Sequence, residues 1–244
     1  MTHARPTADS PPTTPAELRA LARAGRFTGA TAGLAPGFTQ ANLVLLPAAA
    51  ADDFAEFCRC NPRPCPLIEQ TPPGVFEAAH SAPGSDLRTD VPRYRVFRDG
   101  QPEPDEPTDV RDLCTDDMVG FLLGCSFTFE TALATAGLAV RHVEQGSNVP
   151  MYRTAIDCQP AGRFAGPMVV SMRPYPAAQV DAVREITGHF PDMHGAPIHV
   201  GDPAKSHYPD YFADLVVSAR ALEGGAESVN ADEAGRLQRP YGGI

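Results

Sequence analysis

The sequence predicts a single α/β domain in which helices flank a mixed, mostly buried β-sheet, and an α+β arrangement remains the alternative. Its 244 residues are enough for one large domain, and 43% of them are hydrophobic. Short apolar runs typical of strands are interspersed with segments of helical periodicity. The 26 prolines and 21 glycines predict a loop-rich fold with many turns.

The two ends of the chain differ in composition from its centre. Residues 1–13 are rich in proline and threonine and show no periodicity, which predicts a disordered segment. Residues 14–217 are expected to form the domain. Residues 218–244 contain few large apolar side chains and several glycines, so we expect a weakly packed or disordered tail.

The first half of the domain carries clear helix and strand signals. Thr14 and Glu17 have the spacing of a capping box around Pro15, which predicts a helix from there to Gly25. The other elements expected in this half are a buried strand at 40–47, an amphipathic helix at 48–60, and a hairpin at 94–102 that turns at Asp99-Gly100.

The second half is expected to alternate helices and strands. Residues 115–137 are interpreted as two helices broken at Gly124, the second capped by Ser126 or Thr128 and ended by Gly137. The remaining expected elements are strands at 140–146, 151–157, 167–174 and 196–200 and a helix at 177–190.

Charge and composition exclude several classes of function. The net charge of −10 argues against nucleic acid as a partner. Lys205 is the only lysine and no glycine-rich nucleotide motif is present, so we expect no cofactor. No apolar run approaches the ~18 residues of a membrane span, and the first residues lack a secretory signal. These features predict a soluble, cytoplasmic protein whose six cysteines remain thiols.

Three histidines at five-residue intervals form the most unusual motif, HFPDMHGAPIHVGDP. Neither a helix nor a strand brings side chains at this spacing to one point, so we expect no metal site. His189 is interpreted as a helix C-terminal residue. His194 and His199 are candidate acid/base residues, with Asp202 to orient an imidazole or act as a base, and a histidine bonded inside a turn is the equally weighted alternative.

Cys125 and Ser126 are expected beside a helix N-terminus. That position lowers the pKa of a thiol and can create a nucleophile, while Ser126 could cap the helix or bind an oxyanion together with the backbone amides from Gly124 onward. An inert buried cysteine is the alternative at Cys125. Cys58, Cys60 and Cys65 lack the spacing of common zinc modules and are assigned to packing.

Arg153 and Arg173 lie in or at the end of apolar segments that are expected to be strands. A buried guanidinium needs an anionic partner, which is either a carboxylate of the protein or the carboxylate of a substrate. Asn148 and Tyr152 could add neutral hydrogen bonds to such a substrate. Arg88 lies in a second polar cluster, GSDLRTDVPRYR, for which a self-paired, solvated loop is the alternative.

Seven segments in order resemble the bacterial putative hydro-lyase family, to which the D-glutamate cyclase domain of animal mitochondria is related. They are GLAPGFTQANLVLLP, FCRCNPRPCPLIE, GSDLRTDVPRYRVFRDG, DMVGFLLGCSFTFE, RHVEQGSNVPMYRT, GRFAGPMVVSMRP and HGAPIHVGDP. The resemblance runs from about residue 16 to about residue 210. After Asp214 the sequence departs from the family, whose members continue through an apolar stretch with a Cys-Gly pair to a Pro-Gly-His segment. If that segment completes the pocket, the protein is diverged, redirected to another substrate, or inactive.

The resemblance implies a carbon–oxygen lyase that removes water from a small amino or carboxylic acid, by elimination or by cyclisation of a glutamate-like substrate. Arg153 and Arg173 would clamp the carboxylate, and His194 or His199 with Asp202 would transfer protons. The alternatives are acyl or amide chemistry at Cys125 and a non-catalytic carboxylate-binding protein. The expected partner is a small molecule, with neither nucleic acid nor membrane, and homo-oligomer formation is left open.

Overall fold

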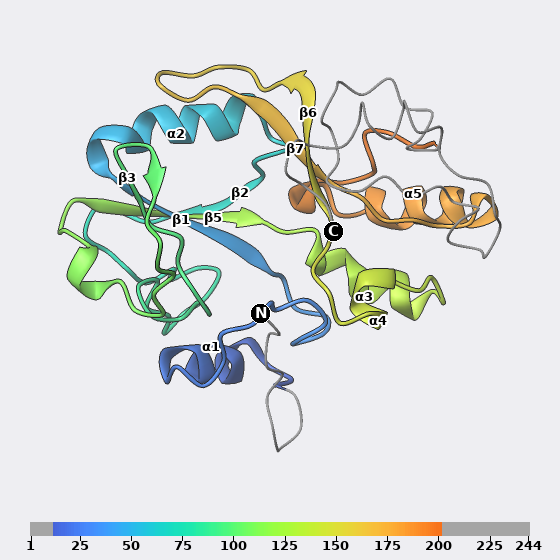
Figure 1. The fold of residues 1–244 in the computed structure, drawn as a ribbon, viewed down its shortest axis with the longest axis horizontal. Helices are drawn as coiled ribbons and strands as arrows, with labels where there is room; N and C mark the ends of the chain where they lie inside the picture. Colours follow the sequence, from blue (N-terminus) through green and yellow to red (C-terminus); the bar gives the residue numbers. More distant parts are fainter. Residues whose placement is uncertain (1–11, 202–244) are drawn as a thin grey trace.

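The computed structural model describes residues 12–201, and the ribbon in Figure 1 follows these residues from blue to orange. The mixture of helices and strands predicted from the sequence is confirmed. The boundary expected at residue 217, the tail at 218–244 and Asp202 lie outside the described residues, as does most of the N-terminal segment.

The centre of the fold is a three-stranded sheet in the order β1-β5-β2. Its strands are β1 (Ala41–Pro47), β5 (Met118–Gly124) and β2 (Leu67–Gln70). Both outer strands are antiparallel to β5, from Ala41 opposite Gly124 to Pro47 opposite Met118 in the β1 register. The chain thus forms a crossover from β1 to β2 with β5 inserted between them.

This insertion corrects the expectation of one mixed sheet. β1 and β2 point the same way, but they never pair, because β5 lies between them. All strand pairs within residues 12–201 are antiparallel and fall into three separate sheets, so the α+β alternative describes the fold.

Both faces of the central sheet are covered. Helix α2 (Ala48–Cys60) lies along one face (Figure 1), where Phe54 and Cys58 pack against Val119 and Phe121 of β5. Leu87 packs with Leu122 in a second cluster, together with Ala78. Burial on both sides explains the continuous apolar sequence of β5.

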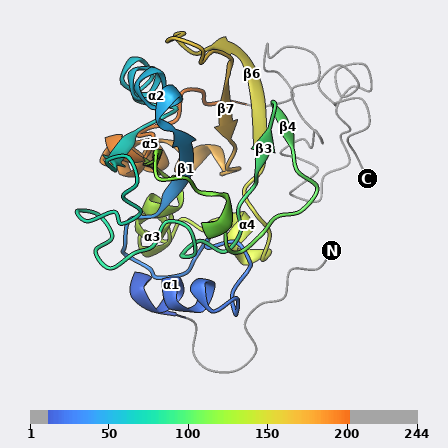
Figure 2. The same cartoon turned by 90° about the vertical axis from the view of Figure 1, so that its left-hand side faces the viewer.

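The hairpin of β3 (Phe97–Arg98) and β4 (Gln101–Pro102) confirms the turn predicted at Asp99-Gly100, and both turn residues have positive φ, 50° and 77°. A longer ribbon pairs β6 (Met151–Asp157) with β7 (Pro167–Ser171). Figure 2 shows both this β6–β7 ribbon and α2 at the top of the view.

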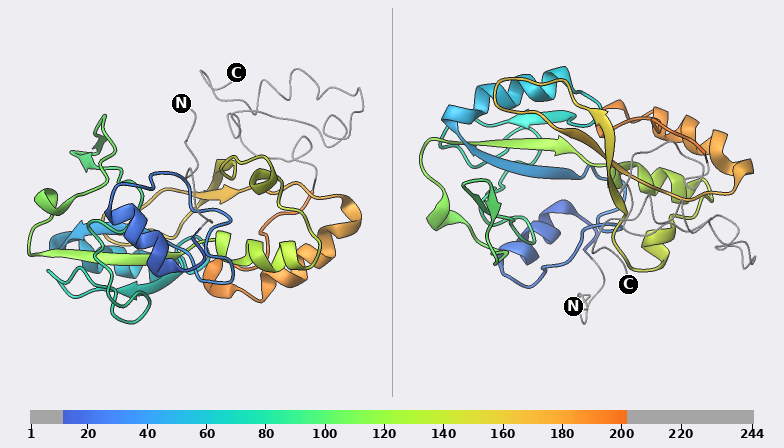
Figure 3. Two further views of the ribbon diagram at one scale, coloured as in Figure 1. Left: turned by 90° about the horizontal axis from the view of Figure 1, so that it is seen from below. Right: turned by 45° about the horizontal axis from the view of Figure 1, so that its top comes forward.

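Helices form the rest of the fold. They are α1 (Pro15–Arg23), α3 (Phe127–Thr135), α4 (Arg141–Glu144) and α5 (Val180–Gly188), with short 3₁₀ turns at Arg111–Leu113, Ala177–Gln179 and Pro191–Met193. Figure 3 shows α1 apart from α3 and α5, which pack on each other through Phe129, Leu133 and Val183. The capping box of α1 is present, with Thr14 and Glu17 bonded reciprocally as predicted.

Three element predictions are wrong. Residues 118–124, expected to be helical, form strand β5, and the segment 140–146, expected to be a strand, contains the short helix α4. Residues 196–200 form no strand. Pro197 has no N–H to donate, and the carbonyl of Ala196 accepts a bond from the Arg63 side chain.

Candidate functional site

A cleft of about 2360 Å³ opens beside the junction of β5 and α3. Residues of β1, β7 and the segment 192–201 line it together with Cys125 and Ser126. Sites for small ligands usually measure about 300–1,000 Å³, so a small acid would fill only part of this cleft. The polar side chains near Cys125 mark the part best suited to chemistry.

Cys125 connects the end of β5 to the start of α3. Its N–H donates to Gln40 O (3.0 Å), and its carbonyl accepts from Thr128 N–H (3.1 Å), so the backbone is fixed on both sides. Burial raises the pKa of the Cys125 thiol, although the Phe127 N–H, the Arg173 charge and the Asn42 side chain oppose this. The thiol is therefore protonated at neutral pH, contrary to the expected lowering of its pKa by the helix N-terminus.

Ser126 occupies the N-cap position of α3 but makes no capping hydrogen bond. Its hydroxyl instead accepts from Nη2 of Arg173 (3.0 Å). The backbone amides next to it are also engaged, since Gly124 N–H donates to Pro66 O (2.8 Å) and Cys125 N–H to Gln40 O. The amides of Gly124 and Cys125 are therefore not free to bind an oxyanion, and the expectation of an oxyanion hole is wrong for these two groups.

Arg173 is bound to a carboxylate of the protein itself. Its Nε donates to Oε1 of Glu130 (3.0 Å), and Nη2 contacts the same oxygen. Nη1 donates to the hydroxyl of Ser171 (2.9 Å), and the guanidinium lies over the Phe129 ring. The sequence left two partners open for Arg173, a carboxylate of the protein or that of a substrate. The structure shows the protein carboxylate, so Arg173 does not form an open clamp for a substrate.

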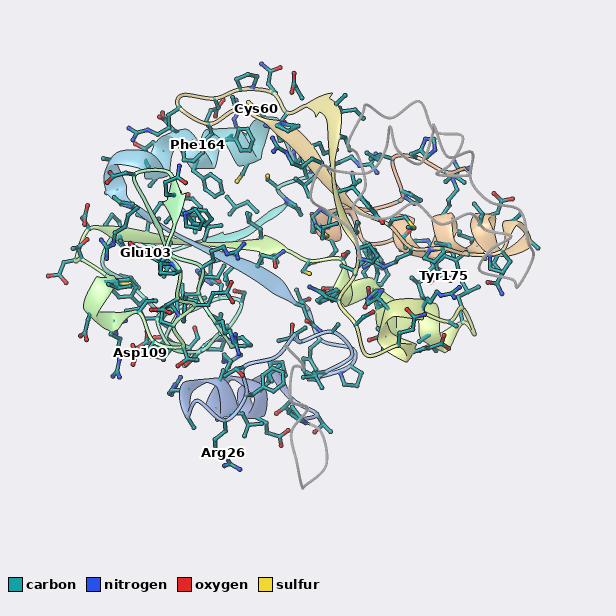
Figure 4. The ribbon with its side chains drawn as sticks, in the orientation of Figure 1. Arg26, Cys60, Glu103, Asp109, Phe164 and Tyr175 are labelled. Carbon is teal, nitrogen blue, oxygen red and sulfur yellow. The ribbon has the colours of Figure 1, made fainter. Side chains whose placement is uncertain are left out.

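The buried ionic cluster, defined as Glu130, Arg173, His142 and Ser126, reaches the cleft wall through Arg173 and Ser126. The Nε2 atom of His142 lies 3.0 Å from Oε1 of Glu130 without hydrogen-bond geometry. Burial lowers the pKa of His142, so this imidazole is neutral. Among the described residues, Oε2 of Glu130 and the hydroxyl of Tyr175, labelled in Figure 4, have no hydrogen-bond partner although both are buried.

His194 lies on the cleft wall in a left-handed conformation with φ 75°. Its Nδ1 is 2.7 Å from the carbonyl oxygen of Arg63, which only accepts, so Nδ1 carries a hydrogen. Burial is the main reason that the pKa of His194 is lowered, with the charges of Arg173 and Arg63 adding to the effect and the carbonyls of Arg63 and Gly124 opposing it. A neutral imidazole with a hydrogen on Nδ1 has Nε2 as its basic atom.

The Arg63 side chain holds the His194 segment to the rest of the fold. Its Nε donates to the carbonyl of His194 (3.4 Å), and its Nη2 donates to the carbonyl of Ala196. The backbone and side chain of one residue therefore fix the position of the imidazole.

The other predicted site residues are dispersed. Asn148, Tyr152 and His199 line the cleft, and His199 is exposed. Arg153 is exposed and does not line the cleft, because alternation along β6 points it away from the buried Tyr152. The expectation of a buried Arg153 is thus wrong.

Arg88 lies outside the cleft as well. It makes paired hydrogen bonds to Asp86 (both 2.9 Å) and stacks over Phe76, so the self-paired alternative is the one observed. His189 caps the C-terminal end of α5, as predicted. Within residues 12–201, no three His, Cys, Asp or Glu side chains are arranged to hold a metal ion, and no helix is long and apolar enough to cross a membrane.

Gly124 determines how closely the His194 segment approaches the sheet. A Cβ atom at this position would overlap the carbonyl of Asp192 and lie 2.8 Å from the sulfur of Met193. We expect Gly124→Ala to lower the free energy of unfolding by about 1–3 kcal/mol, because a packed backbone must move. Chemical denaturation measures the loss. The matched variant Gly137→Asn should be nearly neutral, because asparagine tolerates the positive φ and nothing lies near that position.

Comparison with known proteins identifies the family. A protein-family model described as D-glutamate cyclase matches residues 119–216. A protein of Stutzerimonas stutzeri named "Putative hydro-lyase" is 57% identical over 189 residues, which is 78% of this chain and 71% of that protein. Proteins of the same name from Bordetella petrii and Geobacillus kaustophilus are 56% and 54% identical, covering 79% and 77% of this chain and 75% and 71% of their own lengths. The resemblance found in the sequence is confirmed, and the chain belongs to the bacterial putative hydro-lyase family.

Proposed function

We propose that this protein is a cytoplasmic lyase that removes water from a small amino or carboxylic acid without a cofactor, in the manner of a D-glutamate cyclase. The names of its relatives support the reaction class. The observation that carries the residue assignment is the fixed, neutral His194 on the wall of the cleft that also contains Cys125 and Arg173.

His194 is the proposed proton carrier. Loss of water needs a base to accept a proton from the substrate amine or Cα and an acid to protonate the departing oxygen. With Nδ1 bonded to Arg63, Nε2 of His194 accepts the first proton and can return it to the leaving group. The protonated thiol of Cys125 is a second proton donor in the same cleft.

The proposed contact between Arg173 and the substrate carboxylate uses only part of the guanidinium. Glu130 occupies Nε and Nη2, whereas Nη1 makes one bond to Ser171 and carries a second hydrogen. That hydrogen, together with Asn148 and Tyr152 of the cleft wall, would orient a carboxylate. The exposed Arg153 has no part in this proposal.

The test is a mass-spectrometric screen of amino acids and hydroxy acids, D-glutamate included, incubated with the full chain. The expected result is a product lighter by one water that forms in proportion to enzyme. If an acid raises the melting temperature but is recovered unchanged, the protein binds carboxylates and is not an enzyme for that acid. If the screen shows neither conversion nor stabilisation, the proposal is wrong for these substrates.

Acyl or amide chemistry at Cys125 is the second candidate, favoured by the Phe127 N–H and Asn42 beside the thiol. Here Cys125→Ser should abolish activity, because a hydroxyl is a far weaker nucleophile. If Cys125 only donates a proton, the serine variant should retain part of the turnover. Cys114→Ser is the control, since Cys114 also lines the cleft but follows the 3₁₀ turn at Arg111–Leu113 and does not precede α3.

A further inference from the structure

The loop after α2 brings two cysteines together. Cys58 lies in the last turn of α2, and Cys65 N–H donates to Asn61 O (3.0 Å) to close the turn that follows. The buried Asn61 side chain is fixed by bonds to Phe57 O (2.8 Å) and to both backbone groups of Gln159 (2.7 and 2.8 Å). Alternating prolines at 62, 64 and 66 further restrict the loop.

The two cysteines pack into one cluster. Cys58 is a member of the cluster of Phe54 and Phe121 under α2, Cys65 packs against it, and each thiol shifts the pKa of the other. Cys58 is only 1% exposed, whereas Cys65 is half-buried and accessible from the loop. Cys60, labelled at the end of α2 in Figure 4, is turned away, since its thiol donates to Glu56 (3.4 Å).

We propose that Cys58 and Cys65 form a reversible disulfide and are a modification site for two-electron oxidants, of which hydrogen peroxide is the simplest. The Cys65 thiolate attacks one peroxide oxygen, the O–O bond breaks, and hydroxide leaves and is protonated to water. Cys58 then attacks the sulfur of the Cys65 sulfenic acid, and a second water leaves. Two thiols are oxidised, and one peroxide is reduced to two waters.

The environment assigns the order of these steps. The neighbouring Cys58 lowers the pKa of the Cys65 thiol, while Cys65 and burial raise the pKa of Cys58. Because the thiolate is the attacking form, the half-buried Cys65 reacts with the oxidant and the buried Cys58 resolves the intermediate. The sulfenic acid is thus formed where solvent can reach it.

Arg63 connects the two cysteines to the cleft, because it lies between them in the chain and also lines the cleft. Arg63 bonds to His194 and Ala196 through its backbone and its side chain. A disulfide, with an S–S bond of about 2.05 Å, would pull the ends of this loop together and displace Arg63. Any effect on turnover rests on the proposed function, whereas formation of the disulfide does not.

The test treats the reduced full chain with hydrogen peroxide, blocks the remaining thiols, and maps the linkages by mass spectrometry. Trypsin cleaves after Arg59, which separates Cys58 from Cys65, but Arg63-Pro64 resists cleavage, so Cys60 stays on the Cys65 peptide. The mapping is therefore repeated in Cys60→Ser. We expect a Cys58–Cys65 linkage in both proteins that is reversed by dithiothreitol, and none in Cys65→Ser.

Other outcomes overturn the proposal. A linkage of Cys65 to the nearby Cys158, a linkage between two chains, or over-oxidation of Cys65 without a disulfide would each show that Cys58 does not resolve the intermediate. If the thiols stay unchanged at peroxide concentrations that oxidise free cysteine, peroxide does not react with Cys65 and the proposal is wrong. Because the wild-type chain is mapped directly, the result does not depend on whether a Cys58 variant folds.

Discussion

Replacing His194 with asparagine is expected to lower kcat/KM by about two to four orders of magnitude, the usual contribution of a general acid/base residue. Asparagine is the appropriate replacement because it tolerates the left-handed backbone conformation at this position. The variant therefore removes the imidazole without straining the turn. Turnover of the acid identified by the water-loss screen measures the effect, and an unchanged melting temperature shows that the fold is intact.

His199→Asn and His189→Asn are the matched controls. His199 lines the same cleft but is exposed, and His189 caps α5, so both variants should retain most of the activity. Activity near that of the wild-type chain in His194→Asn, or an equal loss in His199→Asn, would remove His194 from the mechanism.

The pH dependence gives a second measure of the same residue. A base works only when it is deprotonated, and burial holds the pKa of His194 below its usual 6.5. Turnover should therefore stay constant as the pH falls to 6.5 and decline only as the pH drops through the lower, folded-state pKa. A decline that begins well above pH 6.5 would assign the proton transfer to another group.

Local signals predicted most elements of the first half of the fold, although strand β2 was not expected. The capping box at Thr14, the proline that separates β1 from α2, and the Asp99-Gly100 turn each act within a few residues, so no knowledge of the distant chain is needed. The central strand was missed for the opposite reason. A strand buried on both faces has no alternation, and only its pairing with β1 and β2 distinguishes it from a buried helix.

The candidate site was predicted in part. His194, Cys125, Ser126 and Arg173 do line one cleft, although they come from segments far apart in the chain. Glu130 was missed, yet a single acid inside the apolar sequence GFLLGCSFTFETALATAG is a signal, because a buried carboxylate requires a partner. Arg63 carried no such signal, since its role depends on a contact with a segment more than a hundred residues away.

The buried ionic cluster should be the most sensitive point of the fold. The side chains of Glu130 and Arg173 are 5% and 11% exposed, so neutralising either one leaves the other charge buried without compensation. We expect Glu130→Gln to lower the free energy of unfolding by about 3–5 kcal/mol, the usual cost of breaking a buried pair. Urea denaturation measures the change, with Glu56→Gln as the control, because Glu56 pairs with Arg59 on the exposed surface and its loss should leave the midpoint unchanged.

The double variant Glu130→Gln/Arg173→Met measures how much of the stability comes from the interaction between the two side chains. Once the guanidinium is also removed, no uncompensated charge remains, so the double variant should be less destabilised than the sum of the two single variants. Strictly additive losses would mean that the two side chains stabilise the fold independently and that Glu130 does not hold Arg173. In that case Arg173 could bind a substrate carboxylate without losing stability from its pair with Glu130. Arg173 would then act as the open clamp that the sequence predicts.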